Sequence, residues 1–406
     1  MRFTGLKYLQ LLACLGLFAC GSAERYDVVI VGGGASGTAA GLQAARMGAR
    51  TLIVEEFDWL GGMLTSAGVS ATDGNYRLRG GIWDEFRTEL AQHYGCDSAL
   101  MTGWVSNVLF EPSVGDSIFK RLVAGEPNLT VWYRSAAETA ERGKDVWRLG
   151  VRRDGRLRQV EAGVLVDATE LGDVARMAGV PYDVGMDSSA VTHEDIAPAE
   201  ANGIVQDLTY VAVLKDYGRD VTIPRPDGYD PSLFACCCVN DLCIAPKEPH
   251  RMWSREMMIT YGKLPDGKYM INWPKEGNDI NLDVVELPHA ERTAALEAAR
   301  QKTLRFVYHI QHELGYRRLG IADDEFDTPD GLAYLPYHRE GRRMDGVVRM
   351  TLDDVTDRYA RPLYRTGISV GDYPVDHHRN CRTDLPKILF PPVPSFSVPL
   401  GALIPD

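Results

Sequence analysis

The stretch YDVVIVGGGASGTAA, residues 26–40, decides the fold of this chain. Its apolar run Val28–Val31 predicts a short buried strand, and the glycines after it turn the chain into a helix that runs to about Met47. A second apolar run, Thr51–Val54, ends at the acidic residue Glu55. Strand, glycine turn, helix, strand and acidic residue together predict a βαβ unit that binds a dinucleotide.

The three glycines of the GxGxxG pattern each have a task in such a unit. Gly32 permits the tight turn, Gly34 lets the backbone approach a pyrophosphate, and Gly37 allows the helix to pack closely against the strand. The phosphates would meet the positive end of the helix dipole. Glu55 lies 18 residues after Gly37, where a carboxylate accepts hydrogen bonds from an adenosine ribose. The alternative is a βαβ unit without a ligand.

The rest of the chain predicts further strands and then a long helix. β-rich runs lie between residues 130 and 167, with a hairpin turn around Gly155, and strand-like runs return at residues 208–214 and 268–273. The helix that follows carries an apolar stripe of Leu296, Ala299, Thr303, Phe306, Val307, Ile310 and Leu314, and Gly315 ends it. His309 and His312 are expected on its solvent side.

The composition excludes some classes of function. With 406 residues and 45% hydrophobic residues, the chain is long enough for two or three packed domains. Its formal net charge of −12 opposes binding to phosphate backbones, so no nucleic-acid partner is expected.

The first residues are typical of an export signal. Arg2 and Lys7 precede an apolar stretch, residues 8–19, that is too short to span a bilayer. Residues 17–21, LFACG, resemble the bacterial lipobox, where cleavage leaves an acylated cysteine. We therefore expect a signal peptide over residues 1–19 and a lipoprotein held at a membrane of the periplasm or outer membrane through Cys20. A plain secretory signal or a buried N-terminal strand are the alternatives.

Several long motifs in fixed order resemble one family, the FAD-dependent oxidoreductases of the two-dinucleotide-binding flavoprotein superfamily. The likeness is strongest to an exported branch labelled xanthan-lyase-like. The motifs are VVIVGGGASGTAA (28–40), GGMLTSAGVS (61–70), RGGIWDEF (79–86), LVDATELGDVARMAGVPYDVG (165–185), INWPKEGND (271–279), YHREGRRMDG (337–346) and GDYPVDHH (371–378).

The resemblance implies an α/β fold: a Rossmann-like FAD-binding domain of the glutathione-reductase type over residues 20–185, and an α+β substrate domain over residues 186–406. It implies that FAD is held at the pyrophosphate, ribose, flavin and adenine. The residues concerned are Gly32, Gly34, Gly37, Glu55, Gly61, Gly62, Met63, Ala137 and Thr169.

The chain departs from the family pattern at two points. Glu170 stands where most of the superfamily has a glycine next to the cofactor, which puts a close backbone contact there in doubt. The chain stops at Asp406, before the strand, glycine turn and helix that close over the flavin in family members. We therefore expect the FAD-closing segment to be absent.

Two clusters could carry chemistry. In YHREGRR, residues 337–343, His338 could take a proton, and Arg339 or Arg343 could hold a substrate oxygen. A structural network of arginine and glutamate is the alternative. The stretch DYPVDHH, residues 372–378, offers Tyr373 and two adjacent histidines. Because neighbouring residues of a strand point to opposite faces, at most one histidine is expected to face the flavin, and we favour His377. A structural histidine is the alternative.

In an oxidising compartment the cysteine run CCCVNDLC, residues 236–243, favours a disulfide. Free thiols and a metal site are the alternatives, and a metal site is disfavoured because adjacent cysteines cannot all point at one ion without strain. The leading prediction for function is an FAD-dependent oxidoreductase that takes hydride from a carbon bearing a hydroxyl, with His377 or His338 as base. The family's exported members accompany polysaccharide-processing enzymes, which favours a sugar as the small-molecule substrate. The electron acceptor is unidentified, and no second GxGxxG pattern follows for NAD(P)H. The competing hypotheses are a flavin-free carbohydrate-binding or structural lipoprotein, a polysaccharide lyase and an NAD-binding dehydrogenase.

Overall fold

The computed structural model describes residues 23–246, 252–379, 381 and 390–406. The predicted leader and Cys20 lie outside these residues. No helix within the described residues is both long and apolar enough to cross a membrane.

A six-stranded sheet in the order β3-β2-β1-β6-β5-β4 forms the centre of the N-terminal part. β1 (Glu24–Val31), β2 (Thr51–Val54), β3 (Leu129–Trp132) and β6 (Arg156–Asp167) run parallel. β4 (Ser135–Arg142) and β5 (Trp147–Arg153) complete it as an antiparallel meander with β6. The predicted hairpin turn around Gly155 joins β5 to β6, where Asp154 and Gly155 have φ of 49° and 73°.

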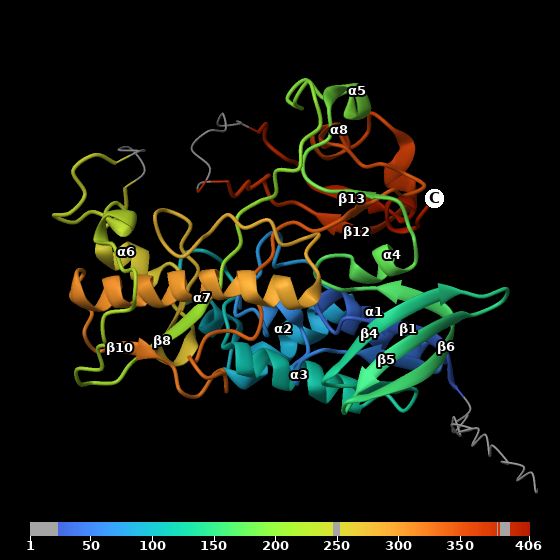
Figure 1. Ribbon diagram of the computed structural model, residues 1–406, viewed down its shortest axis with the longest axis horizontal. Coiled ribbons are helices and arrows are strands. Elements are labelled where there is room, and N and C mark those ends of the chain that lie inside the picture. Colours follow the sequence, from blue (N-terminus) through green and yellow to red (C-terminus); the bar gives the residue numbers. More distant parts are fainter. Residues whose placement is uncertain (1–22, 247–251, 380, 382–389) are drawn as a thin grey trace, which may run out of the picture.

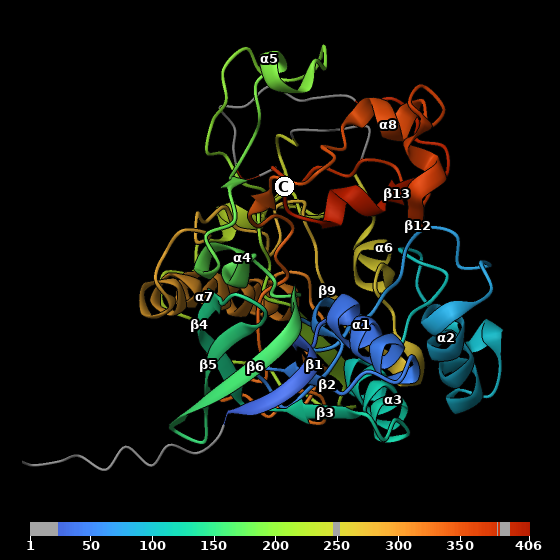
Figure 2. The same cartoon turned by 90° about the vertical axis from the view of Figure 1, so that its right-hand side faces the viewer.

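Helices cover the parallel strands on one side. They are α1 (Ala35–Arg46), α2 (Gly81–His93) and α3 (Pro112–Ala124), and Figures 1 and 2 show α1 and α3 beside β1 to β3. Ile53 of β2 is fully buried against Gly41 of α1, whereas Leu52 points to the other face and packs with residues of the meander. α4 (Asp173–Met177) follows β6 and contacts β4. This arrangement is the expected Rossmann-like FAD-binding fold.

The second part is built on a smaller antiparallel sheet in the order β10-β8-β9. Its strands are β8 (Ala212–Asp216), β9 (Lys268–Ile271) and β10 (Leu319–Ile321), and α6 (Arg255–Thr260) and α7 (His289–His312) belong to the same part. The predicted stripe on α7 is buried, and Gly315 follows the helix with φ of 83°. Figure 1 shows α7 lying lengthwise across the molecule.

The prediction that His309 lies at the surface was wrong. Its side chain is fully buried, and Nδ1 lies 2.9 Å from the hydroxyl of Tyr229. The ring of Phe234 packs against the same imidazole, because the segment before α6 covers this side of α7. His312 is half-buried, with Nε2 at 3.2 Å from the carbonyl of Ile223.

The remaining elements are short. They are β7 (Tyr182–Asp183), α5 (Ser189–Thr192), β11 (Arg343–Met344), α8 (Leu352–Thr356), β12 (Gly367–Gly371) and β13 (Phe396–Pro399), with 3₁₀ turns at Gly62–Leu64, Asp97–Leu100, Pro231–Phe234, Pro265–Gly267, Pro362–Thr366 and Leu400–Leu403. β7 pairs with β11, so the chain beyond residue 340 returns to the end of the FAD-binding part. The predicted disulfide joins Cys236 to Cys243, and the described residues contain no metal-binding cluster of histidine, cysteine and carboxylates.

Candidate functional site

Three segments of the chain meet at the glycine turn after β1. Gly32 has φ of 99°, and a Cβ there would lie 2.2 Å from the carbonyl oxygen of Ala168. A Cβ at Gly37 would lie 2.0 Å from the carbonyl oxygen of Gly32. The amide of Gly61 donates to the carbonyl of Gly33 at 2.8 Å. Glycine is therefore required at 32 and 37 by backbone packing, as the βαβ pattern predicts.

Gly34 differs from these two glycines. A Cβ at Gly34 would meet no protein atom closer than 3.6 Å, and that atom is Oε1 of Glu170. Gly34 also precedes α1, whose N-terminus has no side-chain cap and no acidic residue in its first turn. The free amides and the positive end of the helix dipole are the features that hold a phosphate. The turn therefore fits a dinucleotide pyrophosphate.

Glu55 ends β2 beside this turn. Its carboxylate is buried and accepts hydrogen bonds from the amides of Gly33 at 2.5 Å and Phe57 at 2.9 Å. Burial raises the pKa of Glu55 to about 7, and these two hydrogen bonds oppose the rise. The carboxylate thus orients the turn itself, and its predicted bond to a ribose stays a prediction.

The other residues expected at the cofactor differ in their surroundings. Gly62 approaches the turn so closely that a Cβ there would lie 2.7 Å from Cα of Gly34. Met63 is half-buried between two core clusters, and Ala137 is half-buried on β4. Thr169 follows β6, and its hydroxyl donates to Asp167 and accepts from the amide of Asp173. That hydroxyl is therefore engaged in holding the start of α4.

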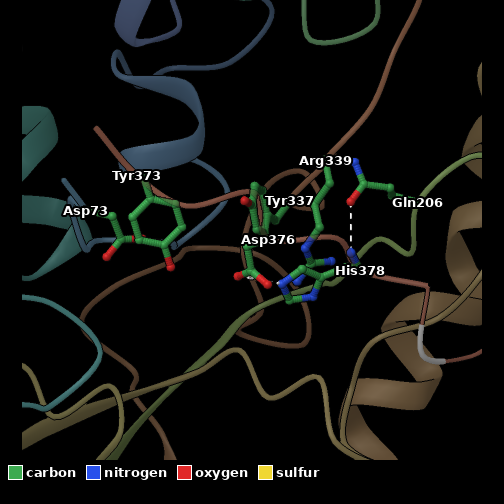
Figure 3. Close-up of a pocket in the computed structure, with 7 residues that line it drawn as sticks. All are labelled: Asp73, Gln206, Tyr337, Arg339, Tyr373, Asp376 and His378. Carbon is green, nitrogen blue, oxygen red and sulfur yellow. Dashed lines mark hydrogen bonds and ion pairs between the residues drawn. The ribbon is translucent and has the colours of Figure 1, made fainter. Parts of the chain in front are cut away.

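A pocket of about 250 Å³ lies where the two parts of the molecule meet. Figure 3 shows its lining residues, which come from four separate stretches of the chain: Asp73, Gln206, Tyr337, Arg339, Tyr373, Asp376 and His378. Residues 62–73 connect the glycine turn to the pocket along the chain. The amide of Thr72 donates to the carbonyl of Val108 at 3.1 Å and fixes the position of Asp73.

One wall of the pocket is a charged network. The guanidinium of Arg339 donates to Asp279 at 3.1 Å, to Thr209 at 3.1 Å and to the carbonyl of Asp207 at 2.8 Å. Its Nε is buried without a partner among the described residues. His378 lies between Asp279, at 3.1 Å from Nδ1, and Asp376, at 3.2 Å from Nε2. Both terminal nitrogens of Arg339 are therefore engaged in hydrogen bonds to other protein groups.

The pKa values of this pocket are shifted in opposite directions. Burial lowers the pKa of His378, but its hydrogen bonds to Asp279 and Asp376 outweigh burial, so the pKa is raised. The His378 hydrogen bond lowers the pKa of Asp376. Asp73 remains accessible to solvent, yet the surrounding protein and the charge of Asp376 raise its pKa to about 6. A carboxyl group with this pKa can take up and release protons near neutral pH.

Burial also raises the pKa of Tyr373 to about 12, and the charges of Asp73 and Asp376 add to the effect. Tyr373 therefore stays protonated and can donate a hydrogen bond from its hydroxyl.

The structure brings only some of the predicted catalytic residues together. Arg339 and Tyr373 line the pocket. His377 does not, because its ring packs edge-on against Phe390 at 5.3 Å, and His378 faces the pocket in its place. Burial and the charge of Arg379 lower the pKa of His377 to about 4.

His338 and Arg343 also lie outside the pocket lining. Burial and the charge of Arg292 lower the pKa of His338 to about 4. Arg343 donates to the carbonyl of Gly185 and to Asp187, both at 2.8 Å. Arg343 thus forms part of an arginine–carboxylate network, the alternative that the sequence left open.

Sequence reasoning missed Asp73, Gln206 and Asp279. Asp73 follows the GGMLTSAGVS motif by three residues, and this closeness to a cofactor-side motif was an available signal. Asp279 ends the INWPKEGND motif and is almost fully buried. A buried carboxylate needs a partner, but the sequence does not show that the partners are Arg339 and His378.

A model of the family described as FAD dependent oxidoreductase matches residues 27–406. No curated protein matches this chain.

Solved structures similar to this chain include three flavoprotein-type enzymes of low identity. CabE, an aromatic hydroxylase from angucycline biosynthesis, is 11% identical with a TM-score of 0.39, and the match covers 80% of this chain and 54% of that one. p-Nitrophenol 4-monooxygenase PnpA from Pseudomonas putida is 12% identical with a TM-score of 0.37, and the match covers 80% of this chain and 70% of that one. A geranylgeranyl bacteriochlorophyll reductase-like protein from Thermoplasma acidophilum is 17% identical with a TM-score of 0.31, and the match covers 48% of each chain.

In most of the solved chains, the matched part is less than two thirds of their length. Likenesses with TM-scores this low add nothing to the assignment, which rests on the family model and on the fit of the glycine turn. The chain belongs to the FAD dependent oxidoreductase family, and FAD is its cofactor.

Proposed function

We propose that this enzyme oxidises a hydroxyl group of a sugar or a related polyhydroxy compound, with the pocket beside Asp73 as its substrate site. The observation that carries the proposal is a proton-accepting carboxyl group in a polar pocket: Asp73, with a pKa of about 6, opposite the hydroxyls of Tyr337 and Tyr373. Oxidation of a hydroxyl needs a base for the hydroxyl proton while hydride leaves the carbon.

Each side chain has a task in such a reaction. Asp73 accepts the hydroxyl proton at its carboxylate, and Tyr373 donates a hydrogen bond to a second oxygen of the substrate. His378, charged between Asp279 and Asp376, keeps Asp376 ionised. Bound FAD supplies the hydride acceptor. Gly32, Gly34, Gly37, Gly61 and Gly62 would hold its pyrophosphate at the turn after β1.

The substrate class follows from the lining of the pocket. Carboxylates, an amide and two phenols offer both donors and acceptors to several hydroxyls, and the aromatic rings offer faces to the C–H side of a sugar. A substrate of low polarity would leave these groups without partners. The leader-like residues 1–20 support a place for this chemistry in the cell envelope, with attachment to a membrane through Cys20.

The experiment is anaerobic flavin reduction by a panel of sugars, uronic acids and polyols. The chain is produced without residues 1–20 and loaded with FAD, and Asp73→Asn is compared with Asp353→Asn, an exposed carboxylate on α8. We expect bleaching of the flavin by at least one polyhydroxy compound, and a rate at least 100-fold lower for Asp73→Asn only. Bleaching by none of them, or an unaffected Asp73→Asn, would overturn the proposal. Release of an unsaturated sugar from xanthan without flavin reduction would favour a polysaccharide lyase instead.

A further inference from the structure

Glu170 places a carboxylate in the turn that fits the cofactor pyrophosphate. Its Oε1 is 3.6 Å from the position of a Cβ on Gly34 and 2.8 Å from that of a Cβ on Gly62. These two glycines face each other across the turn, because the backbones of Gly34 and Gly61 form a parallel bridge. The carboxylate therefore lies between the two glycine segments at the start of α1.

The local fold explains why this side chain points there. The residues on either side of Glu170 are anchored elsewhere: the Thr169 hydroxyl accepts the amide of Asp173, and Leu171 is buried in a small core cluster. The backbone of Glu170 itself packs against Gly341, where a Cβ would lie 3.1 Å from its carbonyl oxygen. Residue 170 has exposed surface, although the surrounding protein partly buries its carboxyl group and raises the pKa of that group. Among the described residues this carboxyl group has no hydrogen-bond partner.

A carboxylate at this place has the same sign as the ligand. The N-terminus of α1 attracts an anion, and no side chain caps it. A pyrophosphate carries two negative charges and binds to the free amides at the N-terminus of α1. Like charges about 4 Å apart repel each other strongly, so the Glu170 carboxylate would repel it. The other carboxylate facing the turn belongs to Glu55 and accepts a hydrogen bond from the amide of Gly33. No arginine or lysine is paired with Glu170 among the described residues to offset its charge.

We propose that Glu170 competes with the FAD pyrophosphate for the glycine turn, so that the cofactor binds only when the Glu170 side chain moves away. Glu170 thereby weakens the binding of phosphate-bearing ligands to this turn. The residue sets how tightly the chain retains FAD, and the effect depends on its charge. The inference rests on the use of FAD and not on the oxidation of a hydroxyl, so it can fail or succeed independently of the proposed function.

The test measures dissociation constants of FAD, ADP and riboflavin by titration calorimetry and flavin fluorescence. The variants are Glu170→Gln and Glu170→Ala, which both remove the charge, and the control is Glu200→Gln, an exposed carboxylate in the loop after α5. We expect both Glu170 variants to bind FAD and ADP at least fivefold more tightly than the wild type. Riboflavin lacks phosphates, so its affinity should be the same in every variant, and Glu200→Gln should bind all three ligands like the wild type.

Two results would overturn the proposal: unchanged or weaker binding of FAD by Glu170→Gln and Glu170→Ala, or an equal gain for riboflavin. Weaker binding would mean that Glu170 helps to hold the cofactor. A thermal melt of each variant without ligand guards against misfolding. Glu170→Asp provides a second measure, because its carboxylate is one methylene shorter and retracts from Gly62. We expect its FAD affinity to lie between those of the wild type and Glu170→Gln.

Discussion

At the scale of single residues, the proposed function depends on one carboxyl group whose surroundings shift its pKa. Asp73 keeps exposed surface, yet partial burial of its carboxyl group and then the charge of Asp376 raise its pKa to about 6. A neutral His378 would leave one carboxylate facing an imidazole lone pair, so the two aspartates favour the imidazolium form. The residue next to it, His377, has its pKa lowered to about 4 by burial. Adjacent histidines thus differ because their surroundings differ.

The pH dependence of turnover tests the role of Asp73. A base must be deprotonated, so activity on the best substrate should be low below the pKa of about 6 and should rise to a plateau above it. The measurement is kcat/KM against pH with an artificial electron acceptor. In Asp73→Asn the acidic limb should disappear together with most of the activity. An acidic limb that survives in this variant would assign the limb to another group.

A second prediction concerns the glycine turn. Gly37→Ala would place a methyl group 2.0 Å from the Gly32 carbonyl oxygen, and backbone must shift to make room. We expect a loss of about 3 kcal/mol or more in the free energy of unfolding, or no folded protein. Gly203→Ala is the matched control, because a Cβ there meets no atom within 4 Å. Its effect should stay within about 0.5 kcal/mol. Equal stabilities of the two variants in urea would contradict the packing described for α1.

At the scale of secondary structure, α7 shows that tertiary packing decides whether a residue beside the apolar stripe of a helix is buried. The helix buries the apolar positions that its periodicity predicts, and it also buries His309. Burial lowers the pKa of His309 to about 4, and its Nε2 has no partner among the described residues. The segment with Tyr229 and Phe234 covers this side of the helix, and the sequence of the helix does not predict that contact.

His309 should make the protein less stable in acid. The unfolded chain takes up the proton near the ordinary pKa of about 6.5, while the folded protein resists it until about pH 4, so stability falls as pH drops through this window. At pH 5 the contribution amounts to about 2 kcal/mol relative to pH 7. Urea unfolding at both pH values should show a smaller loss for His309→Phe than for the wild type. A loss of the same size in both would show that His309 is not the group that titrates.

At the scale of the whole molecule, Arg342 ties together segments that are far apart in the chain. Its side chain is fully buried and donates to the carbonyls of Leu171 and Val285 and to the carboxylate of Asp173. These partners belong to the end of the FAD-binding part and to the segment before α7. The contact sets the position of the 337–343 segment, which lines the pocket through Tyr337 and Arg339.

Removal of this tie should weaken the whole fold. Arg342→Met removes the hydrogen bonds from the buried guanidinium to Leu171, Val285 and Asp173. Arg292 still donates to Asp173 and to the carbonyl of Val285, so the free energy of unfolding should fall by about 2 kcal/mol. Arg152→Met breaks an exposed pair with Glu138 and should cost less than about 1 kcal/mol. Thermal and urea unfolding measure both variants. A small effect of Arg342→Met would mean that the remaining contacts, such as the ion pair of Arg292 with Asp173, suffice to hold the two parts together.

The sequence by itself determined the local and periodic features of this protein. The βαβ unit, the need for glycine at 32 and 37 and the buried stripe of α7 follow from short-range rules of backbone geometry and periodicity. The disulfide within residues 236–243 was predicted from the cysteine run and an oxidising compartment. The long motifs predicted the family, and the family model confirms it.

Only the tertiary structure decided the pocket. Asp73, Gln206 and His378 meet there across more than 300 residues of sequence, and no local rule brings them together. The alternation that favoured His377 applies to strands, whereas β12 ends at Gly371 and residues 372–378 have no regular pairing. In such a segment each side chain points where its tertiary contacts hold it. Asp279 and Asp376 hold His378 toward the pocket, and Phe390 packs against His377.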